Sequence, residues 1–315
     1  MTSKAYEMDL VKTNSTLNEL EYLILASGSD QRAYAILSQC DSTTLKKIVF
    51  IHFAERLSGL PKNNELFDYL KYNKYPIHEI NCSITDPTTC LDEFAKIGFD
   101  GSAKVGIDIS CLTKPYFYYI IKLLKKNFNI KDLPVFYTEP KSYRIPKGIY
   151  EAFHTSSGEL EIISMPGFIG EDAQGKASKL VILLGFDGDL SKEINEDVSP
   201  NETILVNGFP SYVPKFKDIS LTVNEKLVND HGEIRYAKAN NPFETYNVLQ
   251  AIKEKTPGTL LKVAPLGTKP MALGACLFAL HNPEVRIIYP MPKAYKNDYS
   301  ESSWNSWVYN LPLSL

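Results

Sequence analysis

Two short turns in this chain carry residues suited to holding an anion. Thr113-Lys114-Pro115 and Thr268-Lys269-Pro270 each follow an apolar, strand-like run and open a run of helical length. The first amides of a helix lack partners within the helix and carry partial positive charge. Threonine and lysine add a hydroxyl and a full charge there, and proline is well tolerated in the first helical turn. The pattern predicts a phosphate seat, but it equally suits a plain N-cap beside a solvated lysine.

The two turns differ in their surroundings. Gly267 precedes Thr268 and would let a ligand approach the backbone closely, and no carboxylate lies near it in the sequence. The first turn instead follows Asp108 and Ser110. Asp108 could repel an anion, bind a ribose hydroxyl or cap a local turn. We therefore expect Lys269 to be the better phosphate ligand and Lys114 to belong to a diverged copy.

Other polar residues follow the first strand expected in each half of the chain. Ligands of open parallel sheets bind at the carboxyl ends of the strands, so these residues join the candidate site. Tyrosines near the last strand of each half could stack on bases. The predicted ligand-binding residues are Gly267, Thr268, Lys269, Thr113, Lys114, Gly28, Ser29, Asp30, Gly185, Asp187, Tyr137 and Tyr289, with Tyr143 and Tyr295 as further stacking candidates.

The elements that must position these residues alternate between strands and helices. Short apolar, β-branched runs are followed by amphipathic stretches, which predicts βα units and a mainly parallel sheet buried on both faces. Asp86-Pro87 and Asn241-Pro242 have the form of an N-cap followed by the first helical residue. Strand-like runs are expected at 21–30, 46–55, 77–82, 104–109, 133–140, 179–189, 203–209 and 285–295, and helices at 31–40, 63–73, 115–128 and from 242.

The second half of the chain repeats the first. Pro87 and Lys114 are 27 residues apart, as are Pro242 and Lys269. Each half also ends in Pro-Lys-x-Tyr, at 140–143 and 292–295. Several shared features in one order indicate an internal duplication. The fold class expected is α/β: two tandem Rossmann-like modules with mainly parallel sheets, related by a pseudo-two-fold axis and linked by a hairpin-containing connector.

The repeat sets the expected domain boundaries. Residues 1–143 form the first module, 144–178 a connector, and 179–315 the second module with a tail that carries Trp304 and Trp307. Within the connector, Ser157-Gly158 has the composition of a hairpin turn. The tail could pack on its own module, cross to the other one or cover a sheet edge.

Composition excludes several classes of protein. The chain of 315 residues is 44% hydrophobic and 23% charged with a net charge of −3, which argues against extended binding of duplex nucleic acid. Five scattered cysteines and five histidines lack metal-ligand spacing, so neither a metal nor a cofactor is expected. No signal peptide and no apolar run near 18 residues is found, and we expect a cytoplasmic protein that does not enter membranes.

The segment 263-VAPLGTKPMALGACLFAL-280 resembles the strand-to-helix motif of CARF domains and of their tandem relatives, SAVED domains. These are Rossmann-like sensors of nucleotide second messengers in prokaryotic antiviral defence. The resemblance implies ligand contacts by Gly267, Thr268 and Lys269 and, through the repeat, by Thr113 and Lys114. Pro265 and Leu266 stand where the family usually has an aspartate or asparagine and a glycine. The resemblance covers about 20 residues.

Three functions fit these observations. The first is a sensor that binds a nucleotide-like, phosphate-bearing molecule in a cleft between the modules and acts through a protein effector. The second is an enzyme that uses the same cleft on a nucleotide or nucleotide-sugar bond, with Asp30, Asp108 or Asp187 as acid or base. The third is a ligand-free adaptor whose repeat is architecture only and whose tail docks a partner. No combination of residues in the sequence specifies a reaction.

Overall fold

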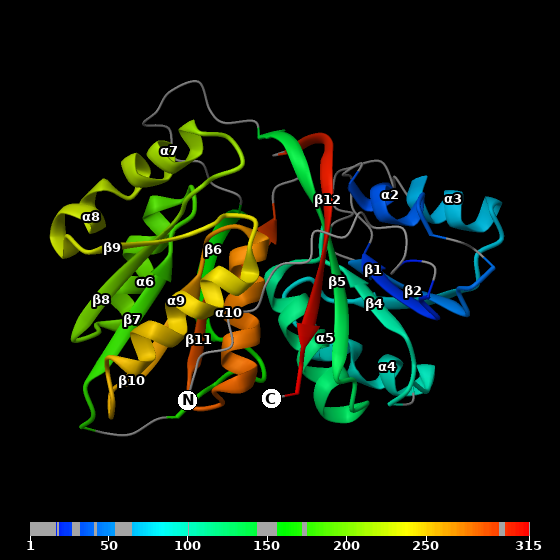
Figure 1. Ribbon diagram of the computed structural model, residues 1–315, viewed down its shortest axis with the longest axis horizontal. Coiled ribbons are helices and arrows are strands. Elements are labelled where there is room, and N and C mark those ends of the chain that lie inside the picture. Colours follow the sequence, from blue (N-terminus) through cyan, green and yellow to red (C-terminus); the bar gives the residue numbers. More distant parts are fainter. Residues whose placement is uncertain are drawn as a thin grey trace. The chain divides into compact units, whose positions relative to one another are not determined.

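The chain forms two mainly parallel α/β modules, each built on its own six-stranded sheet. Figure 1 shows the computed structural model, with sheets flanked by helices. The structure describes residues 17, 19–26, 32–40, 43–53, 65–99, 101–143, 156–171, 175–295 and 300–314. Residues Gly28, Ser29 and Asp30 therefore lie outside the described part of the chain.

The first module has the strand order β12-β5-β4-β1-β2-β3. Neighbouring strands are parallel except for the pair β12 and β5. In chain order its elements are β1 (Tyr22–Ala26), α2 (Arg32–Leu37), β2 (Lys47–Phe53), α3 (Glu65–Tyr72), β3 (Ile77–Cys82), the 3-10 helix η2 (Pro87–Cys90), α4 (Leu91–Ile97), β4 (Val105–Asp108), α5 (Lys114–Asn127), β5 (Asp132–Tyr143) and β12 (Ser300–Pro312).

The second module has the strand order β6-β11-β10-β7-β8-β9. The pairs from β11 to β9 are all parallel. In chain order its elements are β6 (Ser156–Ser164), β7 (Ser178–Leu183), α6 (Gly188–Val198), β8 (Glu202–Gly208), α7 (Lys215–Val223), α8 (Glu225–His231), β9 (Ile234–Ala237), α9 (Pro242–Glu254), β10 (Leu260–Pro265), α10 (Lys269–His281) and β11 (Arg286–Tyr295).

The two sheets have the same order once equivalent strands are matched, as the repeated sequence predicted. Strands β1 to β5 take the places in one sheet that β7 to β11 take in the other. The predicted caps are present as well. Asp86 accepts a hydrogen bond from Thr88 N at 2.9 Å, and Asn241 accepts one from Phe243 N at 3.0 Å. The central strands are buried almost throughout, which explains their continuous apolar runs.

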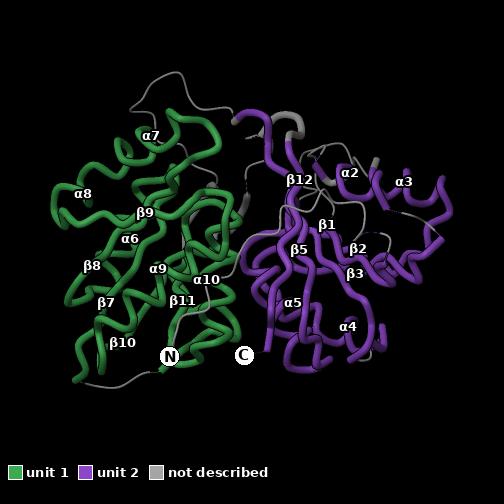
Figure 2. The backbone as a smooth tube through the Cα atoms, in the orientation of Figure 1, with its two compact units in different colours: residues 1–8, 145–293 green, residues 9–144, 294–315 purple. Residues whose placement is uncertain are grey.

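The sixth strand of each sheet lies outside the five-strand repeat: β6 comes from the expected connector and β12 from the tail. Strand β6 follows β5 in the chain yet adds to β11, and β12 follows β11 yet pairs antiparallel with β5. Residues 145–293 consequently form one compact unit, and residues 9–144 with 294–315 form the other (Figure 2). The expected boundaries grouped the tail with the second module and left open that it crosses to the other one or covers a sheet edge; β12 does both, because it pairs with the edge of the first sheet. Trp307 Nε1 donates to Glu139 Oε1 on β5 at 2.7 Å.

The predicted turn at Ser157-Gly158 is absent, because both residues lie inside β6. Strand β6 is hydrogen-bonded to β11, and this pairing outweighs the local turn preference of a serine and a glycine. The chain after β6 stays on the same module. Ile287 N donates to Phe168 O at 3.0 Å, and Glu171 N donates to Glu284 O at 2.9 Å.

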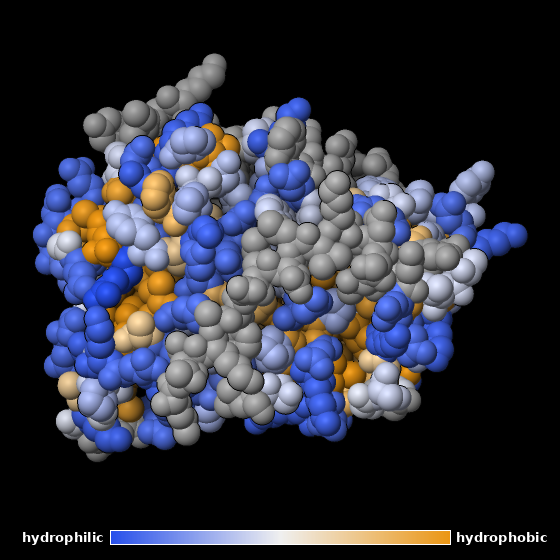
Figure 3. Space-filling view, viewed as in Figure 1, coloured by the Kyte–Doolittle hydropathy of each residue, from blue (hydrophilic) through white to orange (hydrophobic). Residues whose placement is uncertain are grey.

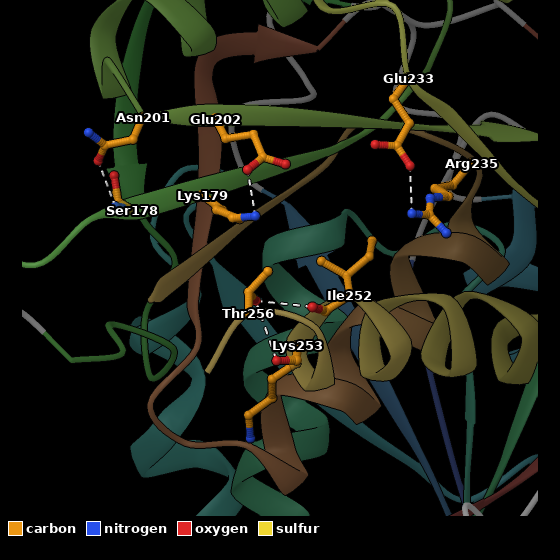
Figure 4. Close-up of polar contacts among 9 residues, drawn as sticks. All are labelled: Ser178, Lys179, Asn201, Glu202, Glu233, Arg235, Ile252, Lys253 and Thr256. Carbon is orange, nitrogen blue, oxygen red and sulfur yellow. Dashed lines mark hydrogen bonds and ion pairs between the residues drawn. The ribbon is translucent and has the colours of Figure 1, made fainter. Parts of the chain in front are cut away.

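Polar contacts hold the second sheet at the edge where β7 and β8 begin (Figure 4). Lys179 Nζ lies 2.5 Å from Glu202 Oε2, and Ser178 N donates to Asn201 Oδ1 at 2.8 Å. At the end of α9, Thr256 Oγ1 donates to Ile252 O at 3.0 Å. These contacts keep the amino-terminal edge in place, and the candidate ligand-binding residues of the module lie at the opposite edge.

Candidate functional site

Each sheet has a switch point at which the chain reverses its direction of strand addition. In the first sheet it lies between β1 and β4, and in the second between β7 and β10. The loops after these strands meet at the carboxyl edge of the sheet, where open α/β sheets bind ligands. Both Thr-Lys-Pro turns follow a switch-point strand, Thr113 after β4 and Thr268 after β10.

Thr268 is the N-cap of α10, as predicted. Its Oγ1 accepts a hydrogen bond from Met271 N at 3.3 Å and donates one to Ala239 O. Pro270 occupies the first turn, and Lys269 is half-buried. Helix α10 is buried along most of its length, and Gly274 lets it pack against the start of α9, since a Cβ there would lie 2.1 Å from Pro242 O. Tertiary packing therefore fixes the direction of this N-terminus.

Glycines bring the two switch-point loops of the second module into close contact. A Cβ at Gly185 would lie 2.5 Å from Leu266 O, and a Cβ at Gly267 would lie 3.2 Å from Leu184 O. The sequence-predicted residues Gly185 and Gly267 are thus brought together. Any larger residue at position 185 would push the loop after β7 away from the Gly267–Lys269 turn.

Asp187 helps to start α6. It is 7% exposed, and its Oδ1 accepts a hydrogen bond from Leu190 N at 3.2 Å, which makes it the N-cap. The loop before it is held from the other side, because Gly185 O accepts hydrogen bonds from Ser220 Oγ and Asn224 Nδ2 at 3.0 and 3.1 Å. Asp187 therefore stabilises the loop, because its carboxylate accepts a hydrogen bond from a backbone amide.

The first module presents the same turn with different chemistry. Thr113 is the N-cap residue of α5 by position, but its side chain makes no capping bond. It is 6% exposed, and its Oγ1 has no hydrogen-bond partner among the described residues. A buried hydroxyl without a partner costs about 1–3 kcal/mol. Lys114 is half-buried, and desolvation lowers its pKa to about 7.

Asp108 caps a local turn, which was one of the roles considered for it from the sequence. It is 2% exposed, and its Oδ1 accepts a hydrogen bond from Ser110 N at 2.8 Å. Ser110 Oγ in turn accepts one from Thr138 N at 2.9 Å and ties the loop to β5. Asp108 caps the turn that leads to Thr113.

The tyrosines chosen as stacking residues lie inside the modules. Tyr137 is 1% exposed and pairs in register with Trp307 of β12, and Tyr289 is 8% exposed. Stacking of a base on either ring would require the core around it to open. The side chains of Tyr143 and Tyr295 lie outside the described part of the chain. Sequence reasoning missed Phe209, an aromatic residue placed directly after a strand end and 51% exposed.

Lys114 should make stability depend on pH. Below pH 7 it is charged in both the folded and the unfolded chain, and between pH 7 and its ordinary pKa of 10.5 only the unfolded chain keeps the proton. The free energy of unfolding of the wild type should therefore rise with pH over this window. Lys114→Met removes the buried amine, so the variant should be more stable than the wild type at pH 7, and its advantage should shrink toward pH 10.

Urea unfolding of both proteins at pH 7, 8 and 9 measures this difference. Lys126→Ala, at the exposed end of the same helix, is the control and should track the wild type. An advantage of Lys114→Met that stays constant from pH 7 to pH 9 would show that the folded lysine does not titrate in this range.

No metal site and no membrane span is evident in the part of the chain that the structure describes. No three histidine, cysteine, aspartate or glutamate side chains there gather closely enough to hold a metal ion. None of the described helices combines the length and the apolar character that crossing a bilayer requires. His52 lies in β2, and its Nε2 is 3.4 Å from Glu79 Oε2. Burial lowers the pKa of His52.

The fold and the strand-end turns define a two-module, Rossmann-like α/β protein. No known protein family and no curated protein matches the chain. Among solved structures, it is similar to a type III CRISPR defence DNA nuclease activated by cyclic oligoadenylate, with a TM-score of 0.52 and 13% identity. The match covers 85% of this chain and 65% of the nuclease chain, so it shows a shared fold over about two thirds of that protein.

A second solved structure is a putative universal stress protein from Pseudomonas aeruginosa UCBPP-PA14. It has 11% identity and a TM-score of 0.26, over 86% of this chain and 94% of that chain.

Proposed function

We propose that this protein is a sensor that binds a nucleotide-like, phosphate-bearing molecule and regulates a protein effector, in the context of antiviral defence. The observation that carries the proposal is the Gly267–Lys269 turn at the switch point of the second sheet. There the amides at the start of a buried helix and a half-buried lysine lie at the edge where such sheets bind ligands, in a turn that the Thr268 hydroxyl holds in shape.

Two comparisons support this choice of ligand. The same turn carries the resemblance to CARF and SAVED domains. A solved structure with a similar fold is a nuclease activated by cyclic oligoadenylate. A sensor also accounts for the two similar modules, since a ligand that changes their relative orientation would give an output that a partner can read.

The aspartates considered for catalysis support the enzyme alternative less well. Asp108 accepts a hydrogen bond from Ser110 N, and Asp187 accepts one from Leu190 N. A general base must reach the proton it removes, and both carboxylates already hold a backbone turn in place. Catalysis stays an outcome of the experiment below.

A panel of mononucleotides and cyclic oligonucleotides tests the proposal. Thermal unfolding is followed with each compound, and the compounds are analysed by chromatography after incubation. A stabilising shift without turnover is expected, because a ligand that binds only the folded chain stabilises it by mass action. Turnover of a compound would instead identify an enzyme. If no compound shifts the unfolding temperature of the wild type or of Lys269→Ala, both the sensor and the enzyme are refuted, and the ligand-free adaptor is the remaining function.

A further inference from the structure

Two aromatic side chains are exposed together on the second module. Phe209 is 51% exposed and Tyr236 is 46% exposed. Their ring centroids lie 6.0 Å apart and their planes are inclined by 73°, so one ring meets the other edge to face. Figure 3 shows apolar surface, in orange, among polar surface on one face of the molecule. A contacting pair of exposed rings is worth explaining, whereas single exposed apolar residues are common.

The pair lies near the carboxyl edge of the second sheet, on the edge strand β9 and the end of its neighbour β8. Phe209 directly follows β8, and Tyr236 is in β9. Backbone bonds extend the pairing beyond the strand ends, from Phe209 N to Ala237 O at 2.8 Å and from Ala239 N to Pro210 O at 3.0 Å. Ala239 O accepts the hydrogen bond of Thr268 Oγ1. One chain of hydrogen bonds therefore links the loop of the aromatic pair to the N-cap of α10.

Side-chain packing connects the same two loops. A Cβ at Gly208 would lie 3.4 Å from Met271 Sδ, and a Cβ at Gly267 would lie 3.2 Å from the same sulfur. The residue before Phe209 and the residue before Thr268 thus approach one methionine in the first turn of α10. The loop that begins at Phe209 therefore packs beside the first turn of α10.

Charge beside the rings suits a nucleotide. Lys217 Nζ lies 5.4 Å from the centre of the Phe209 ring, within the range of a cation–π contact. Its carboxylate partner is Asp218, with the two atoms 3.3 Å apart and Asp218 exposed, so a phosphate could replace this ion pair at little cost. Exposed aromatic rings beside lysines are the elements that bind unpaired bases and their backbone.

We propose that Phe209 and Tyr236 form a stacking surface for one base of the ligand, adjacent to the phosphate seat at Gly267–Lys269. The two inclined rings form a corner, so a flat base can lie against one ring while the other contacts its edge. This inference rests on the proposed function and assigns the base to a place that the buried tyrosines cannot provide. A protein partner docking on the same rings is the competing occupant.

Binding of two probes to the full-length chain tests the assignment. The first is a cyclic oligoadenylate in which one adenine is replaced by the fluorescent base 2-aminopurine, and the second is inorganic tripolyphosphate, which has no base. Phe209→Ala should weaken binding of the nucleotide about tenfold to hundredfold and leave tripolyphosphate unchanged, because stacking contributes about 1–3 kcal/mol per base. Phe209→Trp should retain the nucleotide affinity and the quenching of 2-aminopurine on binding, and Phe209→Ala should lose the quenching.

Three controls separate stacking from other causes. Tyr72→Ala removes an aromatic side chain that is 87% exposed on α3 of the other module, and it should change nothing. Tyr236→Ala should weaken nucleotide binding in the same direction as Phe209→Ala. Lys269→Ala should weaken both probes, since it removes charge from the phosphate seat.

The outcomes distinguish this inference from the proposed function. If the nucleotide binds in a Lys269-dependent way and Phe209→Ala leaves its affinity unchanged, only the stacking assignment is overturned. Equal weakening of nucleotide and tripolyphosphate by Phe209→Ala would overturn it too, because the side chain would then be supporting the fold. Loss of a copurifying protein with unchanged nucleotide binding would assign the rings to a partner. Failure of both probes to bind the wild type would overturn the function and the inference together.

Discussion

Gly188→Ala is expected to lower the free energy of unfolding by about 3 kcal/mol, the upper part of the range for an overpacked site. Gly188 is the first residue of α6, and a Cβ there would lie 1.8 Å from Val223 O and 2.7 Å from Val223 C. These are backbone atoms at the end of α7, so they cannot turn aside as a side chain would. The junction between α7 and α8 would have to shift.

Urea or thermal unfolding measures this loss, which for a unit of 150–250 residues corresponds to about 6–12 °C in Tm. Gly101→Ala is the matched control, because its Cβ would find its nearest neighbour, Phe128 O, at 3.6 Å, which is ordinary contact. That variant should stay within about 0.5 kcal/mol of the wild type. If Gly188→Ala were equally harmless, the α7–α8 junction would have to be soft enough to absorb the added carbon.

The parts of the fold that local sequence decides were predictable. Buried parallel strands need apolar runs, and these located β1 to β5, β7, β8 and β11 within a few residues, whereas the short strand β9 was not predicted. Caps are equally local, so Asp86 and Asn241 could be assigned from their own side chain and the following proline. Fixed spacing between such local features then revealed the repeat and, through it, the second switch point.

Contacts between distant segments were not predictable in the same way. The edge position beside β5 is filled by β12, whose Trp307 lies 168 residues after its partner Glu139. Nothing in the sequence of either segment identifies the other as its partner, and the pairing of β12 with β5 places Trp307 in register with the buried Tyr137. The contact between Phe209 and Tyr236 was missed for the same reason, because these residues come together only when β8 and β9 pair.

The two Thr-Lys-Pro turns have diverged in what their threonines do. Thr268 satisfies its hydroxyl through Met271 N and Ala239 O, so it holds the turn in shape without a ligand. Thr113 Oγ1 is buried with no partner among the described residues, which leaves its hydrogen-bonding capacity for another group. The second turn is thus preformed, whereas the first turn contains a buried hydroxyl without a hydrogen-bond partner among the described residues. The lysines that follow should differ accordingly in how they contribute to binding.

Lys269→Ala is expected to weaken binding of a cyclic oligoadenylate about tenfold to hundredfold, since a hydrogen bond to a charged group contributes about 1.5–3 kcal/mol. Lys114→Ala should have an effect that depends on pH. Desolvation lowers the pKa of Lys114 to about 7, so the side chain is mostly neutral at pH 8 and mostly charged at pH 6. If it contacts a phosphate, the loss of affinity caused by Lys114→Ala should grow as the pH falls from 8 to 6.

Isothermal titration at pH 6, 7 and 8 measures both effects, with Lys126→Ala as the control, because Lys126 is exposed in the last turn of the same helix as Lys114. A pH-independent loss with Lys114→Ala would mean that Lys114 is already charged in the free protein from pH 6 to pH 8, so that its pKa lies above this range. No loss at any pH, beside a large loss with Lys269→Ala, would mean that only the second copy binds. The turn of the first module would then have only a structural role. Its unpartnered Thr113 hydroxyl and desolvated Lys114 would lower the stability of the fold without contributing to binding.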